Sequence, residues 1–221
     1  MTLLLAALAA PAFASDLATS LWHPGAAAMD KGFAYAGTTV LAAAGPDAAG
    51  TWGGATAAWA PTKRLAFSGT GIAAVGSTVV GGGVRFNVIE SRWFRGGPVA
   101  FAAAWDHTEN EASRAIGGGL GVAVEAGFTR VRFDTFVPLV VATEGTGPLA
   151  PADRLPGFNA WEVGMTIRMG DSHANRLRGT ASSSGLTFAY QHVGNHWFME
   201  TAIGAGVAPT VYGSLRGGFV F

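Results

Sequence analysis

Apolar and polar residues alternate along most of this chain with a period of two. In the segment 131–139 (VRFDTFVPL), the odd-numbered positions carry Val, Phe, Thr, Val and Leu, while the even-numbered ones include Arg132 and Asp134. The segment 161–169 (WEVGMTIRM) alternates in the same way. Successive side chains of a β-strand point to opposite faces, so this pattern predicts strands with one apolar and one polar face.

The same pattern predicts twelve strands, most of them near the roughly 9–11 residues that a tilted strand needs to cross the hydrocarbon of a bilayer. The segment 176–181 alternates only weakly, and without it eleven strands remain. An even number is expected when both ends of a barrel lie on one side of the membrane, so we predict twelve, with ten as the alternative. The predicted strands are 33–43, 51–60, 65–75, 78–89, 98–106, 114–125, 129–141, 158–169, 176–181, 186–193, 197–207 and 210–221.

The two faces of these strands differ in kind. One carries large apolar residues, and the other carries small residues with scattered charges. A soluble sandwich would turn a strongly charged face to water, yet only 13% of the chain is charged. We therefore predict an all-β fold, a transmembrane antiparallel up-and-down β-barrel with its apolar face toward lipid and its small and charged face toward a lumen. A soluble exported sandwich is the alternative.

The predicted connections agree with a barrel. The segments 61–64 and 127–129 are short turns on one side, while the polar segments 106–113 and 142–157 are longer and fall on the other. Outer-membrane barrels combine short periplasmic turns with longer outer loops. Tryptophans at or near the predicted strand ends fit the aromatic girdles of such barrels. These are Trp52, Trp59, Trp93, Trp105, Trp161 and Trp197.

The first residues are predicted to be a targeting segment. Residues 3–14 form an unbroken apolar run that ends in Ala-Phe-Ala, a pattern that signal peptidases accept. The run is shorter than the roughly 20 residues of a spanning helix. We therefore predict a signal peptide at 1–14, a periplasmic leader or lumen plug at 15–32, and the barrel at 33–221.

The segment LWHPGAAAM (21–29) shows no alternation. It resembles the Asn-Pro-Ala hatch segment of the long-chain fatty-acid outer-membrane transporter family, with His23 in place of Asn. The resemblance implies a plug and the uptake of hydrophobic compounds. The barrel predicted here is smaller than that of the family.

The chain finishes with GGFVF (217–221), in which apolar residues alternate up to a terminal Phe. This ending resembles the last strand of bacterial outer-membrane β-barrel proteins, whose terminal aromatic residue is read by the barrel assembly machinery. The resemblance implies a location in the bacterial outer membrane and contact with that machinery through Phe221.

The composition of the chain restricts the classes of partner and binding site that we expect. Fourteen basic residues balance fourteen acidic ones, which argues against a nucleic-acid partner. Cysteine is absent, which excludes disulfides and thiolate zinc sites. We expect outer-membrane lipid as the surroundings, a monomer, and no cofactor.

Charged residues on the small face are predicted to point into the lumen. A charge in a dry interior is costly, so these residues should pair or contact water. They form either a constriction that selects solutes or a network that fills the barrel. The predicted lumen-lining residues are Arg85, Arg130, Arg132, Asp134, Glu162, Arg168, Glu200 and Arg216, with Asp106 and Glu125 on the same face. Small residues expected beside them are Ala100, Ala102, Ala104, Gly117, Gly119, Gly121, Gly204 and Gly206.

The segment YQHVGNHW (190–197) is similar to the His-x-Ser-Asn sequence of the lipid A deacylase family. Gly194 stands at the position of the nucleophile and has no side chain to attack with, so we predict no such activity. A metal held by His192 and His196 would need a third ligand, for which Glu200 is the only local candidate. We predict no metal.

These observations predict an integral outer-membrane barrel that acts as a passive channel for small polar or amphiphilic solutes. The alternatives are a structural or surface barrel without transport, and a hydrophobe transporter or lipid-modifying barrel enzyme.

Overall fold

The computed structural model describes residues 34–45, 48–62, 64–107, 113–128, 130–146, 161–170, 174–183, 185–206 and 211–221. The predicted signal peptide at 1–14 and the leader or plug at 15–32 lie outside the described residues. No helix in the described part of the chain is long and apolar enough to cross a membrane.

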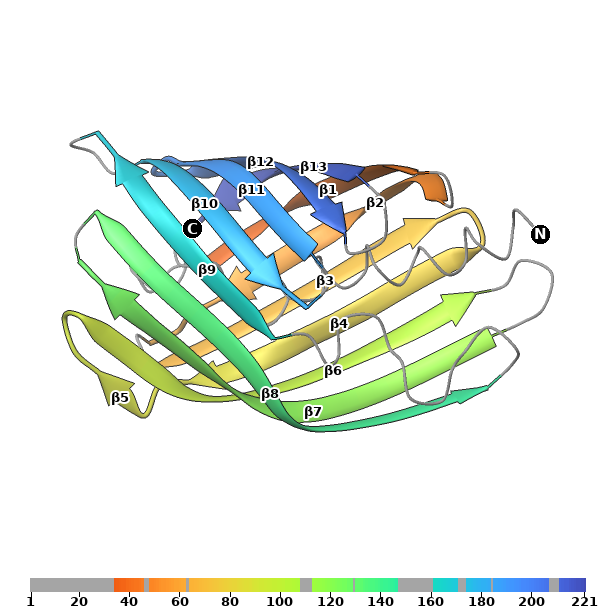
Figure 1. Ribbon diagram of the computed structural model, residues 1–221, viewed down its shortest axis with the longest axis horizontal. Helices are drawn as coiled ribbons and strands as arrows, with labels where there is room; N and C mark the ends of the chain where they lie inside the picture. Colours follow the sequence, from red (N-terminus) through yellow and green to blue (C-terminus); the bar gives the residue numbers. More distant parts are fainter. Residues whose placement is uncertain are drawn as a thin grey trace.

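The described residues form one antiparallel sheet that closes into a twelve-strand barrel, with a short thirteenth strand, β5, at its margin (Figure 1). Neighbours in sequence are neighbours in the sheet, and the barrel is closed by pairing of β1 with β13 and of β4 with β6. The strands are β1 (Ala34–Gly45), β2 (Ala48–Trp59), β3 (Leu65–Ala74), β4 (Ser77–Phe86), β5 (Ile89–Glu90), β6 (Phe94–His107), β7 (Ser113–Gly127), β8 (Val131–Thr146), β9 (Glu162–Met169), β10 (Asn175–Ser182), β11 (Gly185–Val193), β12 (Trp197–Gly206) and β13 (Val211–Val220).

The predicted fold class is therefore confirmed, and twelve rather than ten is the number of barrel strands. The weakly alternating segment 176–181 is the core of β10, which pairs with β9 and β11 along its whole length. The addition that the pattern did not predict is β5, a two-residue strand that pairs with the start of β6.

The apolar face of the strands points outward. Val163 on β9 and Leu215 on β13 are 47% and 53% exposed, while Glu162 and Asp134 on the opposite face are 3% and 6% exposed. A soluble fold would bury the first pair and expose the second. The closed sheet pairs the backbone N–H and C=O groups, and this orientation presents apolar side chains to the outside. A membrane-spanning barrel requires both.

The two ends of the barrel differ. Ala34 stands opposite Trp59, and Tyr35 stands opposite Val220, so both ends of the barrel's chain lie at the end that also carries the short turns after β2 and β7. We call this the terminal end; short turns are typical of the periplasmic side. At the opposite end, which we call the loop end, β6 and β8 finish and β7 begins.

The inner face carries more large side chains than predicted. Phe101 and Trp105 on β6 and Phe136 on β8 face inward and are at most 5% exposed, together with Val99. The expectation that Ala100, Ala102 and Ala104 line the lumen is wrong, because these three are exposed on the outer face. In β6 both faces are apolar, so alternation alone could not tell which set of residues faces lipid.

Glycines on the neighbouring strand make room for these inward rings. A Cβ added at Gly119 would lie 2.5 Å from Cζ of Phe101, and one added at Gly121 would lie 2.7 Å from Cε2 of Phe136. The two rings also meet edge to face, with their centroids 5.7 Å apart. Aromatic rings that cover glycines of the adjacent strand are a known way to stabilise a barrel wall.

Candidate functional site: the charged inner wall

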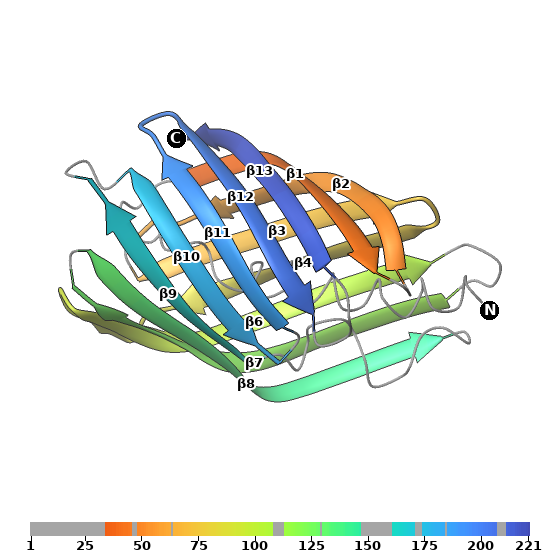
Figure 2. The same cartoon turned by 45° about the horizontal axis from the view of Figure 1, so that its top comes forward.

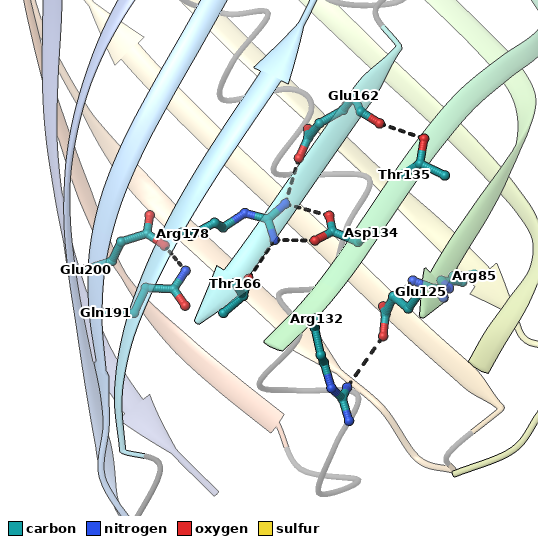
Figure 3. Close-up of polar contacts among 10 residues, drawn as sticks. All are labelled: Arg85, Glu125, Arg132, Asp134, Thr135, Glu162, Thr166, Arg178, Gln191 and Glu200. Carbon is teal, nitrogen blue, oxygen red and sulfur yellow. Dashed lines mark hydrogen bonds and ion pairs between the residues drawn. The ribbon is translucent and has the colours of Figure 1, made fainter. Parts of the chain in front are cut away.

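Arg178 on β10 is the centre of a buried charge cluster. It donates two hydrogen bonds of 2.7 Å to the two carboxylate oxygens of Asp134 on β8. Its Nη2 also lies 2.8 Å from Oε1 of Glu162 on β9. Figure 3 shows the guanidinium between the two carboxylates, which come from the two preceding strands. Bidentate pairing of this kind is among the strongest polar contacts in proteins, so the cluster joins three strands across the inner face.

Gly164 on β9 makes space for this cluster. A Cβ at this position would stand 2.7 Å from Nη2 of Arg178 and 2.9 Å from each carboxylate oxygen of Asp134. Thr166, two residues further along β9, accepts a 3.3 Å hydrogen bond from Nη1 of Arg178. The glycine and the threonine therefore let the Arg178–Asp134 pair lie flat against β9.

A second cluster surrounds Glu125 on β7. Nη1 of Arg85 on β4 lies 2.6 Å from Oε1 of Glu125, and Nη1 of Arg132 on β8 lies 3.7 Å from Oε2. The Arg85 side chain is fully buried and also donates a 2.8 Å hydrogen bond from Nε to Oδ1 of Asn87. A fully buried arginine is stable only with such partners, so this cluster fixes the wall between β4 and β8.

A polar row crosses the wall from β9 to β1. Arg168 stands opposite Arg176, which stands opposite Gln191, and the row continues through further cross-strand pairs. Its later members are Glu200, Arg216 and Thr39. Gln191 donates a 2.5 Å hydrogen bond to Glu200, which also forms an ion pair of 3.5 Å with Arg216. Two arginines directly opposite each other are unfavourable in a sheet, so the Arg168–Arg176 pair is a conspicuous concentration of positive charge.

The predicted lumen-lining residues fall into two groups. Seven of the eight lie at inward-facing strand positions, as does Glu125. The seven are Arg85, Arg132, Asp134, Glu162, Arg168, Glu200 and Arg216. Arg130 instead lies in the turn between β7 and β8, where it is exposed. Asp106 shares the outward face of β6 with Ala104 and forms an ion pair of 3.1 Å with Arg114 at the loop end, so its expected inward position is wrong.

Sequence reasoning missed the residues of β10 and the start of β6. Arg176 and Arg178 lie on β10, and Arg95 lies on β6 at an inward position opposite Glu125. The signal was present in β10, because two arginines separated by one residue must share a face of a strand. The low apolar content of that strand obscured it.

The histidine segment lies at the terminal end and forms no catalytic arrangement among the described residues. Nδ1 of His192 lies 2.7 Å from Oδ1 of Asn175, and its ring stacks on Trp197 with centroids 4.5 Å apart. Gly194 lies in the turn after β11. Glu200 faces the lumen whereas His192 lies on the other face of β11, so the suggested third metal ligand cannot join the histidine.

Comparison with known proteins finds resemblance at the level of the fold. A structure described as the KdgM porin in complex with disordered oligogalacturonate aligns with a TM-score of 0.58 and 6% identity, covering 85% of this chain and 99% of the porin. A second KdgM porin structure aligns with a TM-score of 0.53 and 8% identity, over 86% of this chain and 98% of that one. The translocator domain of the autotransporter NalP from Neisseria meningitidis covers 93% of this chain at a TM-score of 0.46 and 12% identity. Family models and curated proteins give no match.

The fold is therefore that of bacterial outer-membrane β-barrel proteins. The outer face supports a location in a membrane, because large apolar side chains such as Phe133, Leu139 and Phe188 are half or more exposed there. Hydrocarbon is the solvent in which such a face is stable, so the protein resides in the bacterial outer membrane.

Proposed function

We propose that this protein is a passive outer-membrane channel for small polar or amphiphilic solutes, with a preference for anions. The observation that carries the proposal is the charge of the inner face. The inward-facing charged residues of the described strands are seven arginines, Arg85, Arg95, Arg132, Arg168, Arg176, Arg178 and Arg216, and five carboxylates, Glu90, Glu125, Asp134, Glu162 and Glu200.

The inner face of the described strands thus has a positive formal charge, although the whole chain has none. A confined wall of one sign raises the local concentration of counter-ions and favours their passage. The arginines are also well suited to bind carboxylates or phosphates, because the planar guanidinium offers paired donors. The porin fold supports passage through the lumen, but the choice of anions rests on the arginines alone.

The test is ion selectivity in planar bilayers. The wild-type protein should conduct, and its reversal potential in a salt gradient should have the sign of an anion-preferring pore. The double variant Arg168→Gln/Arg176→Gln removes the two facing charges of the polar row, so the reversal potential should move toward cation preference. The shift should be larger at low ionic strength, because salt screens charges over about 10 Å at 0.1 M.

Arg114→Gln is the matched control. It removes one positive charge from an exposed arginine at the loop end, outside the polar row, and should leave the selectivity nearly unchanged. A wild-type protein that does not conduct would contradict the channel and favour a structural barrel. A conducting protein whose selectivity does not respond to the double variant would contradict the anion preference alone.

A further inference from the structure

Three arginines meet on the inner wall where β8, β9 and β10 lie side by side. Arg168 on β9 stands directly opposite Arg176 on β10. Arg132 on β8 stands opposite Thr166, which lies two residues before Arg168 on the same face of β9. Side chains directly opposite each other have Cβ atoms about 5 Å apart, and diagonal neighbours lie about 7–8 Å apart. The three guanidinium groups can therefore reach one anion beside β9. We call these three residues the arginine triad.

The triad has a buried member and two that are accessible from the lumen. Arg176 is 4% exposed, whereas the side chain of Arg132 is 18% exposed and Arg168 is also partly exposed. Arg132 and Arg168 lie close enough to Arg176 to repel its charge. A solute at this wall therefore meets Arg132 and Arg168 directly, next to the more deeply buried charge of Arg176.

The carboxylates described around the triad are shared with other arginines. Arg178, two residues after Arg176, holds two of them through hydrogen bonds of 2.7 and 2.8 Å. Glu125 lies 3.7 Å from Arg132 but 2.6 Å from Arg85. These three carboxylates therefore leave the triad with an excess of positive charge.

A phosphate group matches this arrangement better than a carboxylate does. A carboxylate has two oxygens, which a single guanidinium can engage in a bidentate pair. A phosphate monoester has three acceptor oxygens and a charge of about −1.5 to −2 at pH 7. It can accept hydrogen bonds from three guanidinium groups at once, and its charge offsets the repulsion among them.

The triad lies close to the terminal end of the barrel. Arg168 is the last residue but one of β9, and Arg176 is the second residue of β10. In Figure 2, β9 ends and β10 begins at the left, which is also where β8 begins. A solute that approaches from the terminal end can reach the triad without crossing the whole lumen, so binding can be measured separately from conduction.

We infer that the arginine triad is a binding site for the phosphate group of a small solute, either inorganic phosphate or a phosphate monoester. The inference rests on the proposed channel function and names its solute class. The phosphate bridges Arg168 and Arg176, whose charges face each other across two strands, and Arg132 adds a third donor group from β8. Bound phosphate thus stabilises the part of the wall where like charges are concentrated.

Unfolding by urea in phospholipid vesicles at low ionic strength, followed by tryptophan fluorescence, tests the binding. Millimolar inorganic phosphate should raise the urea midpoint of the wild-type protein. Succinate at the same ionic strength should raise it less, because its two negative charges lie on separate carboxylates. Equal midpoints in phosphate and succinate would overturn the assignment of phosphate.

Arg168→Gln removes one guanidinium of the triad. The phosphate concentration that gives half of the stabilisation should rise by about tenfold, because one set of charged hydrogen bonds is lost. Arg168→Lys keeps the charge without the paired donors and should lie between this variant and the wild type. Arg114→Gln, at the loop end, is the matched control and should keep the full response. Each variant is first shown to be folded by its different gel mobility before and after boiling.

An unchanged response in Arg168→Gln would overturn the site, because phosphate would then act as a general stabilising salt. If Arg168→Gln does not fold, Arg132→Gln replaces it, with the same expected loss. Glycerol 3-phosphate distinguishes the two sources of the phosphate group: a response equal to that of inorganic phosphate assigns esters to the site, and no response assigns the free ion.

Conductance of the same proteins tests the channel separately. A protein that phosphate stabilises but that does not conduct would overturn the channel alone. A conducting protein without a phosphate response would overturn the binding site alone.

Discussion

The lumen has two walls that are stabilised in different ways. On β6, β7 and the part of β8 that begins at Phe136, Val99, Phe101 and Phe136 pack as they would in the core of a soluble protein. On β8, β9 and β10 toward the terminal end, Arg178 and its carboxylates take their place. Both walls use the same local device, a glycine that makes room for a large group from the next strand. Glycines on the inner face thus create space in both walls. The large residue on the adjacent strand determines whether that space is filled by an apolar or a charged group.

Removing the centre of the charged wall should have the largest effect on stability. Arg178→Met leaves Asp134 and Glu162 as buried carboxylates without their shared cation, and breaking a buried ion pair from one side costs about 3–5 kcal/mol. Unfolding by guanidinium in phospholipid vesicles, followed by tryptophan fluorescence, measures the loss. The triple variant Arg178→Met/Asp134→Asn/Glu162→Gln should recover part of it. Equal stability of Arg178→Met and wild type would mean that the cluster does not hold the wall together.

The stability of the apolar wall should fall when a substitution creates a cavity in it. Phe136→Ala removes a fully buried ring from the cluster with Phe101, and the free energy of unfolding should fall by about 3 kcal/mol. Phe136→Leu, which keeps most of the volume, should cost clearly less. The same unfolding assay compares the two. If both variants cost nothing, the inward rings are not a core, and the contrast between the walls fails.

A smaller substitution tests whether a glycine is needed to make room for a large group of the adjacent strand. Gly164→Ala puts a methyl group where the Arg178–Asp134 pair lies, so the pair must shift, at a cost of about 1–3 kcal/mol. Gly53→Ala on β2 is the matched control, because a Cβ there has nothing within 4 Å, and its unfolding should be close to that of the wild type. Equal effects of the two substitutions would show that the position of the glycine does not matter.

Most of the fold was predictable from the sequence, because the period of two is a property of each strand by itself. The positions of most strands and the outward apolar face follow from that period. The number twelve also needed the rule that such barrels have an even number of strands. What it could not give is orientation where both faces are apolar, as in β6, where Phe101 rather than Ala100 faces inward. Asp106 was misplaced for the same reason, because it shares the outward face of β6 with Ala104. Arg130 was misplaced because it lies in the turn before β8.

The charged clusters were only partly predictable. The pattern identified Asp134 and Glu162 as inward residues, but not the arginine between them, because β10 carries too few apolar residues to stand out. Nor does a one-dimensional pattern contain the register, which determines that Arg178 reaches back to both acids.

The location of Arg178 also has a consequence for the order in which the barrel is made. Its two acids belong to strands that precede β10 in the chain, so the hydrogen bonds of its guanidinium are complete only once β8 lies beside the hairpin of β9 and β10. A hairpin delivered to the lipid by itself would carry an arginine with only one of its two acids. We therefore expect these three strands to be stable in hydrocarbon together rather than one at a time.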